Sequence, residues 1–320
     1  MTKKPLKIGT RASMLALWQA NWVKSEIEKR HGLTVELVKI KTTGDKITDV
    51  PLAKVGGKGL FVKEIEEALL SKEVDLAVHS MKDVPTVFPN GLHLKAITKR
   101  EDPRDALISR HGEKLSELPK GANIGTSSLR RQSQLLKARS DLNISQLRGN
   151  LDTRLRKLEE GVYDAIILAG AGIKRLGWAD KITELIEPDV MLPAIGQGAL
   201  GIETRTEDDY VNGLTEFFDH RDTSVAVRAE RAMLKRLDGG CQVPIAAYGI
   251  VKGEELRLTG LVASVDGLRI IKDVISGNTI DAETLGVTLA ERLLKAGAKE
   301  ILDELYRVES ESERQNAPGV

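Results

Sequence analysis

The sequence is poor in the residues that stabilise small secreted proteins and in those that bind nucleic acids or membranes. It has one cysteine in 320 residues, so no disulfide can form within the chain and a reducing compartment is expected. Aromatic residues make up only 3%, which argues against a surface that stacks the bases of single strands. Lysine and arginine number 48 against 47 acidic residues, so the net charge of +1 provides no global field for nucleic acid or an anionic membrane.

Long apolar runs and common cofactor motifs are also missing. No segment approaches the ~20 apolar residues of a membrane span, and the opening MTKKPLKIGT lacks a signal-peptide core. The five histidines show no metal-ligand spacing, so no metal site is expected. KVGGKGLF (54–61) does not match the GxxxxGKS/T nucleotide loop, and we interpret it as a flexible lid. We expect a cytoplasmic monomer that binds neither nucleic acid nor membrane.

Over its first two thirds, the sequence alternates short apolar runs with helical patterns, which is typical of α/β units with largely parallel sheets. A weak internal repeat accompanies this pattern. IGTRASMLALWQA (8–20) is similar to IGTSSLRRQSQLL (124–136), and SKEVDLAVHS (71–80) is similar to EGVYDAIILA (160–169). The repeat predicts two lobes of similar build, with mixed, largely parallel sheets.

The expected domain boundaries follow from segments that contain proline and glycine and from a change in the predicted secondary structure near residue 220. The chain leaves the first lobe near TKREDPRDA (98–106) and returns near MLPAIGQGALGIETR (191–205), which predicts a double-crossing hinge with a cleft beneath it. Later segments read as helix, three strands and two helices, a small α+β domain. The expected units are lobe 1 from residues 1–98 and 199–217, lobe 2 from 104–192, a C-terminal domain from 221–308 and a disordered tail from 309–320.

Basic and hydroxyl side chains gather where the second lobe's strands and helices meet. Thr126, Ser127 and Ser128 precede a predicted helix, whose free N–H groups favour an anion. An arginine cluster lies at this and neighbouring strand ends: Arg130, Arg131, Arg148 and Arg154. Ligands bind at the carboxyl ends of strands in such sheets. The simpler interpretation is that these arginines lie on helix faces exposed to solvent. A guanidinium binds carboxylate and phosphate alike, so charge alone does not identify the ligand.

Two residues, Asp83 and Cys241, each allow either a chemical or a purely structural role. Asp83 follows the strand VDLAVHS, where it could act as a general acid or base, or simply form a turn. Cys241 follows two glycines and the end of a predicted helix. The helix dipole there raises the thiol pKa, which is unfavourable for a nucleophile in every turnover but acceptable for a group attached once. A small buried cysteine is the other interpretation.

Eight motifs taken together resemble one enzyme family. In chain order between residues 6 and 307 they are KIGTRAS, PLAKVGGKGLFVKEIE, AVHSMKDVP, REDPRDA, GTSSLRRQ, LRGNLDTRL, LPAIGQGALGIE and ERAMLKRLDGGCQVPI. This combination closely resembles the hydroxymethylbilane synthase, or porphobilinogen deaminase, family. The resemblance implies two lobes like those of periplasmic binding proteins and a small cysteine-bearing domain. It also implies head-to-tail polymerisation of four porphobilinogen molecules, with release of ammonia and final release of the tetrapyrrole by water.

The resemblance further assigns roles to residues of this sequence. It implies a dipyrromethane cofactor joined by a thioether to Cys241, with Asp83 as the catalytic carboxylate. The implied binders of cofactor and substrate carboxylates are Lys82, Thr126, Ser127, Ser128, Arg130, Arg131, Arg148, Asn150 and Arg154. The implied secondary contacts are Arg11, Ser13, Gln19, Lys58, Phe61, Ser80, Arg175 and Gln197. A bilobal, carboxylate-binding sensor or transport-type protein without catalysis is the alternative on fold grounds alone.

Overall fold

The first lobe is built on a mixed five-stranded sheet. The computed structural model describes residues 4–46, 62–238 and 243–315. The strand order is β2-β1-β3-β10-β4, in which β1 is parallel to β2 and β3, while β10 is antiparallel to β3 and β4. The strands are β1 (Leu6–Thr10), β2 (Val35–Lys39), β3 (Leu76–Ser80), β4 (Leu92–Ile97) and β10 (Leu200–Arg205).

The second lobe repeats this arrangement. Its strand order is β7-β6-β8-β5-β9, in which β6 is parallel to β7 and β8, while β5 is antiparallel to β8 and β9. The internal repeat is therefore confirmed, because β1 and β3 occupy the positions of β6 and β8. The strands are β5 (Asp105–Ser109), β6 (Asn123–Gly125), β7 (Asn143–Ser145), β8 (Ala165–Ala169) and β9 (Glu184–Ile186).

The sheets are less parallel than the sequence pattern predicted, although their mixed character is confirmed. In each lobe, the strand that follows a crossing between lobes, β5 or β10, lies antiparallel to both of its neighbours. These crossing strands enter from the hinge, in the direction opposite to the βαβ units. Half of the strand pairings described in the two lobes are consequently antiparallel.

Helices cover the sheets and position the strand ends. Helix α1 begins after Ser13, whose hydroxyl accepts a hydrogen bond from Ala16 N at 3.3 Å, and ends at Gly32 in the left-handed conformation. In lobe 1, α1 and α7 share one apolar cluster with the sheet, while α3 packs in another. The helices are α1 (Met14–His31), α2 (Thr43–Lys46), α3 (Lys63–Leu70), α4 (Leu129–Ala138), α5 (Leu151–Glu159), α6 (Gly170–Arg175) and α7 (Asp209–Thr215).

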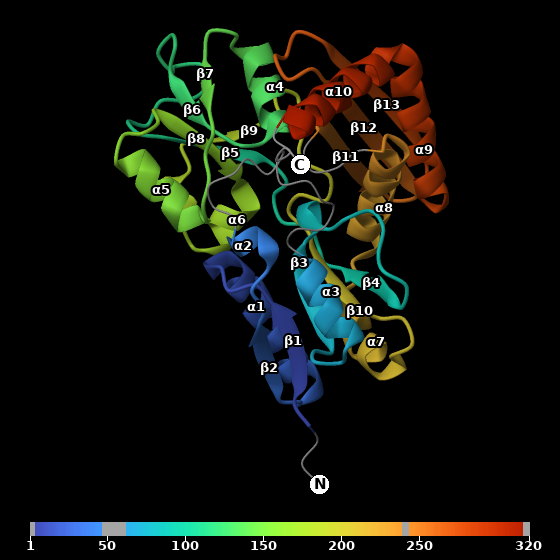
Figure 1. Cartoon of the computed structure of the whole chain (residues 1–320). Coiled ribbons are helices and arrows are strands. Elements are labelled where there is room, and N and C mark those ends of the chain that lie inside the picture. The colour runs from blue at the N-terminus through green and yellow to red at the C-terminus, as the bar shows by residue number, and fades with distance from the viewer. Residues whose placement is uncertain (1–3, 47–61, 239–242, 316–320) are drawn as a thin grey trace.

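The third unit is a three-stranded antiparallel sheet covered by helices (Figure 1). Its apolar cluster joins α8 and α9 to β11 and β12. The elements are α8 (Arg221–Arg236), β11 (Ile245–Lys252), β12 (Glu255–Ala263), β13 (Ile270–Asn278), α9 (Ala282–Leu293) and α10 (Lys299–Gln315). No helix within the described ranges is long and apolar enough to cross a membrane.

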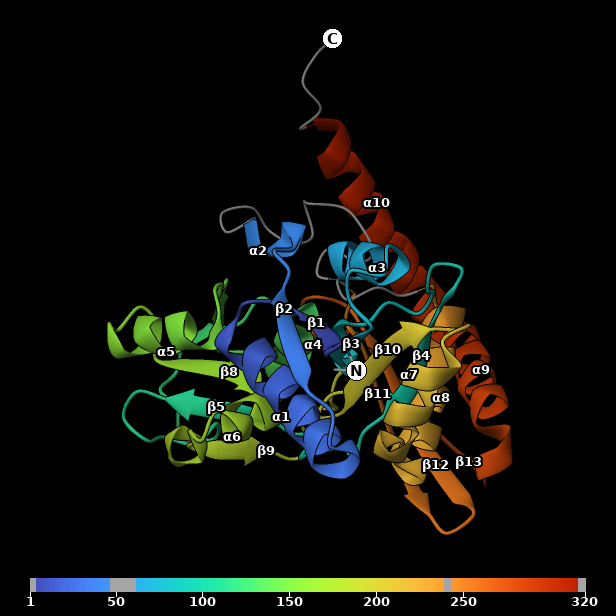
Figure 2. The same ribbon diagram turned by 90° about the horizontal axis from the view of Figure 1, so that it is seen from below.

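The expected disordered tail is partly wrong. Helix α10 continues to Gln315 and projects from the body of the molecule (Figure 2). Its first turns are anchored by the buried side chains of Ile301 and Leu302. The Glu, Arg and Gln residues that follow are good helix formers and extend the anchored helix. Residues 316–320 lie outside the described part of the chain.

One buried carboxylate joins both crossings to the third unit. Arg100 Nη2, on the first crossing, donates to both oxygens of Glu230 at 2.9 Å. The return crossing donates Gly196 N to the same carboxylate at 2.7 Å, and β11 donates Gly249 N at 2.8 Å. Because Glu230 lies on α8, these bonds fix the third unit against the hinge.

Candidate active site

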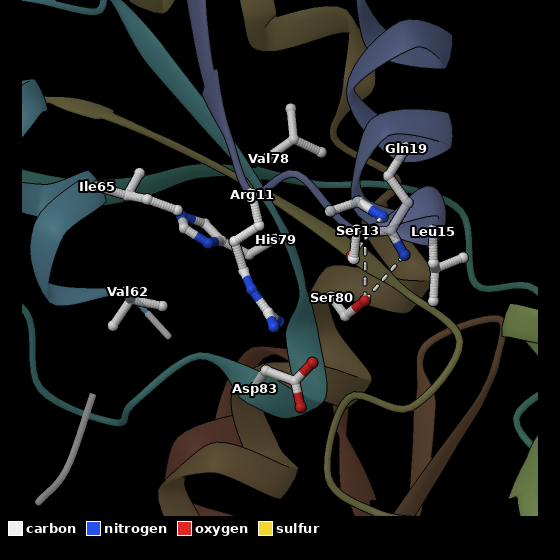
Figure 3. A pocket seen from close by; sticks show the side chains of 11 residues that line it. Arg11, Ser13, Leu15, Gln19, Val62, Ile65, Val78, His79, Ser80 and Asp83 are labelled. Atoms are coloured by element: carbon white, nitrogen blue, oxygen red, sulfur yellow. Dashed lines mark hydrogen bonds between the residues drawn. The ribbon is translucent and has the colours of Figure 1, made fainter. Parts of the chain in front are cut away.

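A solvent-open pocket lies at the carboxyl ends of β1 and β3 (Figure 3). The two strands are parallel, so the turns that follow them meet at one edge of the sheet. The turn after β1 supplies Arg11 and Ser13, and the turn after β3 supplies Asp83. The remaining lining is Leu15, Ala16, Gln19, Val62, Ile65, Val78, His79 and Ser80.

Asp83 lies exposed on a short 3-10 turn, Met81–Asp83, at the mouth of this pocket. Figure 3 shows the Arg11 guanidinium directed towards its carboxylate. Behind them, buried Gln19 donates from Nε2 to Ser80 Oγ at 2.9 Å. The sequence-predicted Arg11, Gln19, Ser80 and Asp83 are therefore brought together. Ser13 also lines the pocket, but its hydroxyl is already the N-cap of α1.

Lys82 carries a perturbed charge next to Asp83. Burial lowers the pKa of Lys82 from 10.5 to about 8, while Asp83 raises it and Arg131 of lobe 2 lowers it further. The turn is held by the return crossing: a Cβ on Gly196, which has φ 69°, would lie 2.7 Å from Met81 Cβ. Only glycine permits this approach. Charges of both lobes act on Lys82, since Asp83 lies on its own turn and Arg131 in lobe 2.

Arg130 and Arg131 are buried against a carboxylate that sequence analysis did not identify. Arg130 Nη1 lies 2.8 Å from Asp105 Oδ2, and Arg131 Nη2 lies 2.8 Å from Asp105 Oδ1. Arg130 Nη1 also donates to Leu192 O at 2.7 Å, and Arg131 Nη1 donates to Ile167 O at 3.0 Å. The two cations share one anion, so the group keeps an excess positive charge.

The pKa values of this buried group follow from its charges. Burial raises the pKa of Asp105, but Arg130 and Arg131 outweigh it and bring that pKa from 3.8 to about 2. Burial lowers the pKa of Arg131, and the carboxylates of Asp105 and Asp83 oppose that effect. The interaction of Arg131 with Asp83 places the turn of lobe 1 opposite the arginines of lobe 2.

Arg148 and Arg154 keep guanidinium donors available. Arg154 Nε donates to Gly149 O at 2.7 Å, and its side chain has no other hydrogen bond within the described residues. Arg148 has no side-chain partner there. Burial, followed by Arg131, lowers the pKa of Arg154 to about 10, and burial lowers that of Arg148. Two partly desolvated cations with free N–H groups are what a carboxylate ligand requires.

The hydroxyl residues of lobe 2 divide into bonded and available groups. Ser127 Oγ donates to Leu147 O at 2.7 Å, and Thr126 Oγ1 accepts from Ser128 N at 3.2 Å. Ser128 and Asn150 are the N-caps of α4 and α5, and neither side chain bonds its own helix. Their side chains are therefore the freer donors of this group.

Two further predicted contacts lie at the hinge. Gln197 is 1% exposed, and its Nε2 donates to Pro103 O at 2.6 Å and to Asp105 Oδ1 at 3.1 Å. Arg175 Nη2 donates to Gly198 O at 2.6 Å, and burial lowers the pKa of Arg175 to about 10. Gln197 therefore supports Asp105 from within the protein, while Arg175 retains unused donors.

Three predicted residues, Lys58, Phe61 and Cys241, lie outside the described residues, as does the whole of the proposed lid, residues 54–61. The chain resumes after Cys241 at Val243, which is buried in the same apolar cluster as Ile195 of the return crossing. Gly196, which follows Ile195 in the chain, packs against Met81 and Lys82. The described end of the cysteine segment is thus tied to the crossing that touches the Asp83 turn.

Sequence reasoning missed the buried carboxylates that organise the site. Asp105 stands within the motif REDPRDA, and Glu230 within the helix pattern of α8, but neither pattern indicates its tertiary partners. A further group, Glu66, His79 and Glu203, lies behind the pocket wall. Among the described residues, no set of three His, Cys, Asp or Glu side chains is placed to hold a metal ion.

Comparison with known proteins covers nearly the whole chain. Residues 6–213 match the sequence model of the porphobilinogen deaminase dipyromethane cofactor binding domain, and residues 224–295 match that of the porphobilinogen deaminase C-terminal domain. Porphobilinogen deaminases from Geobacter metallireducens and Geobacter sulfurreducens are each 63% identical over 98% of this chain and 99% of their own length. A periplasmic substrate-binding protein of a Coxiella burnetii ABC transporter is 15% identical, with TM-score 0.40 over 65% of this chain and 89% of its own.

Proposed function

This chain belongs to the porphobilinogen deaminase family, and from that premise we propose that it joins four porphobilinogen molecules head to tail, with loss of ammonia at each addition, and releases hydroxymethylbilane by hydrolysis. It is a transferase of tetrapyrrole biosynthesis. The relatives support this enzymatic interpretation and not that of a non-catalytic sensor. A monomer working in the cytoplasm is part of the same proposal.

The observation that carries the proposal is the excess of positive charge facing Asp83. Porphobilinogen bears an acetate and a propionate, so a growing chain presents many carboxylates. Arg148 and Arg154 offer free guanidinium donors, and Lys82 adds a charge on the opposite lobe. Charge-assisted hydrogen bonds of this kind contribute about 1.5–3 kcal/mol each. The donor set fits a polycarboxylated pyrrole chain.

The same donors fit the dipyrromethane cofactor, whose rings carry the same acids. When bound, the cofactor supplies the pyrrole carbon to which the first substrate is added. Cys241 is the proposed attachment point of the cofactor. Arg148 and Arg154 would hold the carboxylates of the cofactor, and Ser128 and Asn150 would add neutral donors. The remaining implied contacts, Lys58 and Phe61 among them, keep their proposed roles. The domain limits given above are also part of the proposal.

Asp83 is the proposed catalytic residue. Loss of ammonia from porphobilinogen leaves a cationic methylene-pyrrolenine, which an adjacent carboxylate stabilises. In this proposal the same carboxylate accepts a hydrogen bond from the pyrrole N–H and takes part in proton transfer. Arg11 is directed towards Asp83, and the Gln19–Ser80 hydrogen bond lies at the end of the strand that leads into the turn. Arg130 and Arg131, fixed by Asp105, supply the positive field for substrate acids.

The proposal is tested by the stoichiometry of turnover. Purified holoenzyme is incubated with porphobilinogen, and ammonia and hydroxymethylbilane are quantified together. Four ammonia molecules for each tetrapyrrole support the proposed reaction. Binding of porphobilinogen without release of ammonia would contradict it and favour the sensor.

A further inference from the structure

Three titratable side chains meet behind the wall of the pocket, on the face of the lobe 1 sheet covered by α3. His79 of β3 lies with Nε2 2.9 Å from Oε2 of Glu203 on β10. Glu203 is 1% exposed and Glu66, on α3, is 9% exposed. His79 also lines the pocket that contains Arg11 and Asp83. A buried cluster therefore reaches the surface that receives substrate.

The cluster contains more acid than its single imidazole can balance. Oε1 of Glu66 and Oε1 of Glu203 are both buried without a hydrogen-bond partner among the described residues. Burying two carboxylates together, each with one oxygen that lacks a partner, is costly, so one of them is expected to keep its proton. Glu203 has the imidazole partner, which leaves Glu66 as the group that stays protonated.

The charges around Glu66 lead to the same assignment. Burial and the carboxylate of Glu203 raise the pKa of Glu66 to about 7, while His79 opposes them and Glu67 adds a smaller increase. On β10, Arg205 is engaged by Asp208 at 2.7 Å.

Charged side chains of the neighbouring strands have partners other than Glu66 or are exposed. On β4, His93 Nε2 contacts Asn212 at 3.1 Å and Lys95 pairs with Glu216 at 3.8 Å, both on the side of α7 and the segment after it. On β1, Lys7 is exposed. His79 is therefore the basic side chain that faces Glu66.

We propose that Glu66 is a positioning residue for the proposed reaction. Held protonated behind His79, Glu66 adds no second negative charge behind the pocket wall and so preserves the binding of substrate carboxylates. This inference rests on the proposed function. Ionisation of Glu66 places negative charge behind a pocket whose ligand carries two carboxylates against one ammonium. The KM for porphobilinogen then rises, while kcat changes little because Asp83 is untouched.

The test is the pH dependence of KM in holoenzyme carrying Glu66→Gln, which keeps the size of the side chain but cannot ionise. In the wild type, KM is expected to rise from about pH 7, by on the order of tenfold, which is the effect of a unit charge roughly 10 Å away at an effective dielectric constant of about 20. A second rise near pH 8 belongs to Lys82. Glu66→Gln should lose the first rise and keep the second. Glu67→Gln, an exposed change on the same helix, should keep both.

An unchanged KM profile in Glu66→Gln overturns the proposal. If that variant does not fold, carbon-13 NMR of glutamate-labelled wild-type holoenzyme decides. One glutamate carboxyl should titrate near pH 7, and the absence of such a signal overturns the proposal. The NMR titration does not depend on turnover. An enzyme inactive at every pH contradicts the proposed function, whereas an active enzyme without this titration contradicts only the role of Glu66.

Discussion

Replacement of Asp105 by Asn tests whether one buried carboxylate holds the arginine cluster together. Asp105 is fully buried, and Arg130 and Arg131 each reach it within 2.8 Å. Asn keeps the shape but leaves two buried guanidinium groups without an anion. Removing one partner of a buried ion pair typically costs about 3–5 kcal/mol. The free energy of unfolding at pH 7, measured with urea, should fall by about that amount.

The dependence of the free energy of unfolding on pH, below about pH 5, gives a second estimate of the contribution of Asp105. The pKa of Asp105 is depressed from 3.8 to about 2 in the folded protein, so its contribution is present above the unfolded value and is lost as the pH falls towards 2. The shift corresponds to about 2 kcal/mol. Wild-type protein should lose this contribution between about pH 5 and pH 2, and Asp105→Asn should not.

The matched control is Glu160→Gln. Glu160 pairs with Arg156 at 3.8 Å in the same lobe, but both side chains are more than half exposed, and such an ion pair contributes little. Its urea midpoint should stay close to that of the wild type. If Asp105→Asn unfolds at the wild-type urea concentration and keeps the wild-type acid profile, the assignment of Asp105 as the anchor of Arg130 and Arg131 is wrong.

Two further substitutions address the proposed reaction. Asp83→Asn should fold and carry cofactor but lose roughly 100-fold or more in kcat, the contribution of a positioned acid or base; near-wild-type kcat would remove Asp83 from its role. Arg154→Leu should raise the KM for porphobilinogen roughly tenfold or more, because a charged hydrogen bond contributes about 1.5–3 kcal/mol. Arg156→Leu, whose side chain is 66% exposed two residues along the same helix, is its control. Equal KM values in the two variants would show that Arg154 does not bind the substrate.

The local features of the fold were readable from sequence because they depend on neighbouring residues. The repeated Ile-Gly-Thr segments predicted the equivalence of β1 and β6, and the small hydroxyl residues after them predicted helix starts. The antiparallel placement of β5 and β10 was not predicted, because it depends on where each crossing segment enters the opposite lobe. Periodicity carries no information on that choice.

The site shows the same division. Residue type and position were enough to propose Arg148, Arg154 and Asp83 as candidates, because Arg148 and Asp83 follow strands and Arg154 lies in the first turn of the next helix. The burial of Arg130 and Arg131 was not predicted, because Asp105 is more than twenty residues away and meets them only when β5 lies beside β8. The partners of Glu230 and the group of Glu66, His79 and Glu203 likewise join distant segments. A single sequence shows charges but not which of them share a buried volume.

The central claim is that a cleft lined with arginines holds a polycarboxylated pyrrole chain joined to the sulfur of Cys241. Its most direct test is the intact mass of the purified protein under denaturing conditions, beside that of Cys241→Ala. We predict that the wild type carries the added mass of one dipyrromethane and that the variant carries none. A fully active wild type with the unmodified mass would contradict the claim.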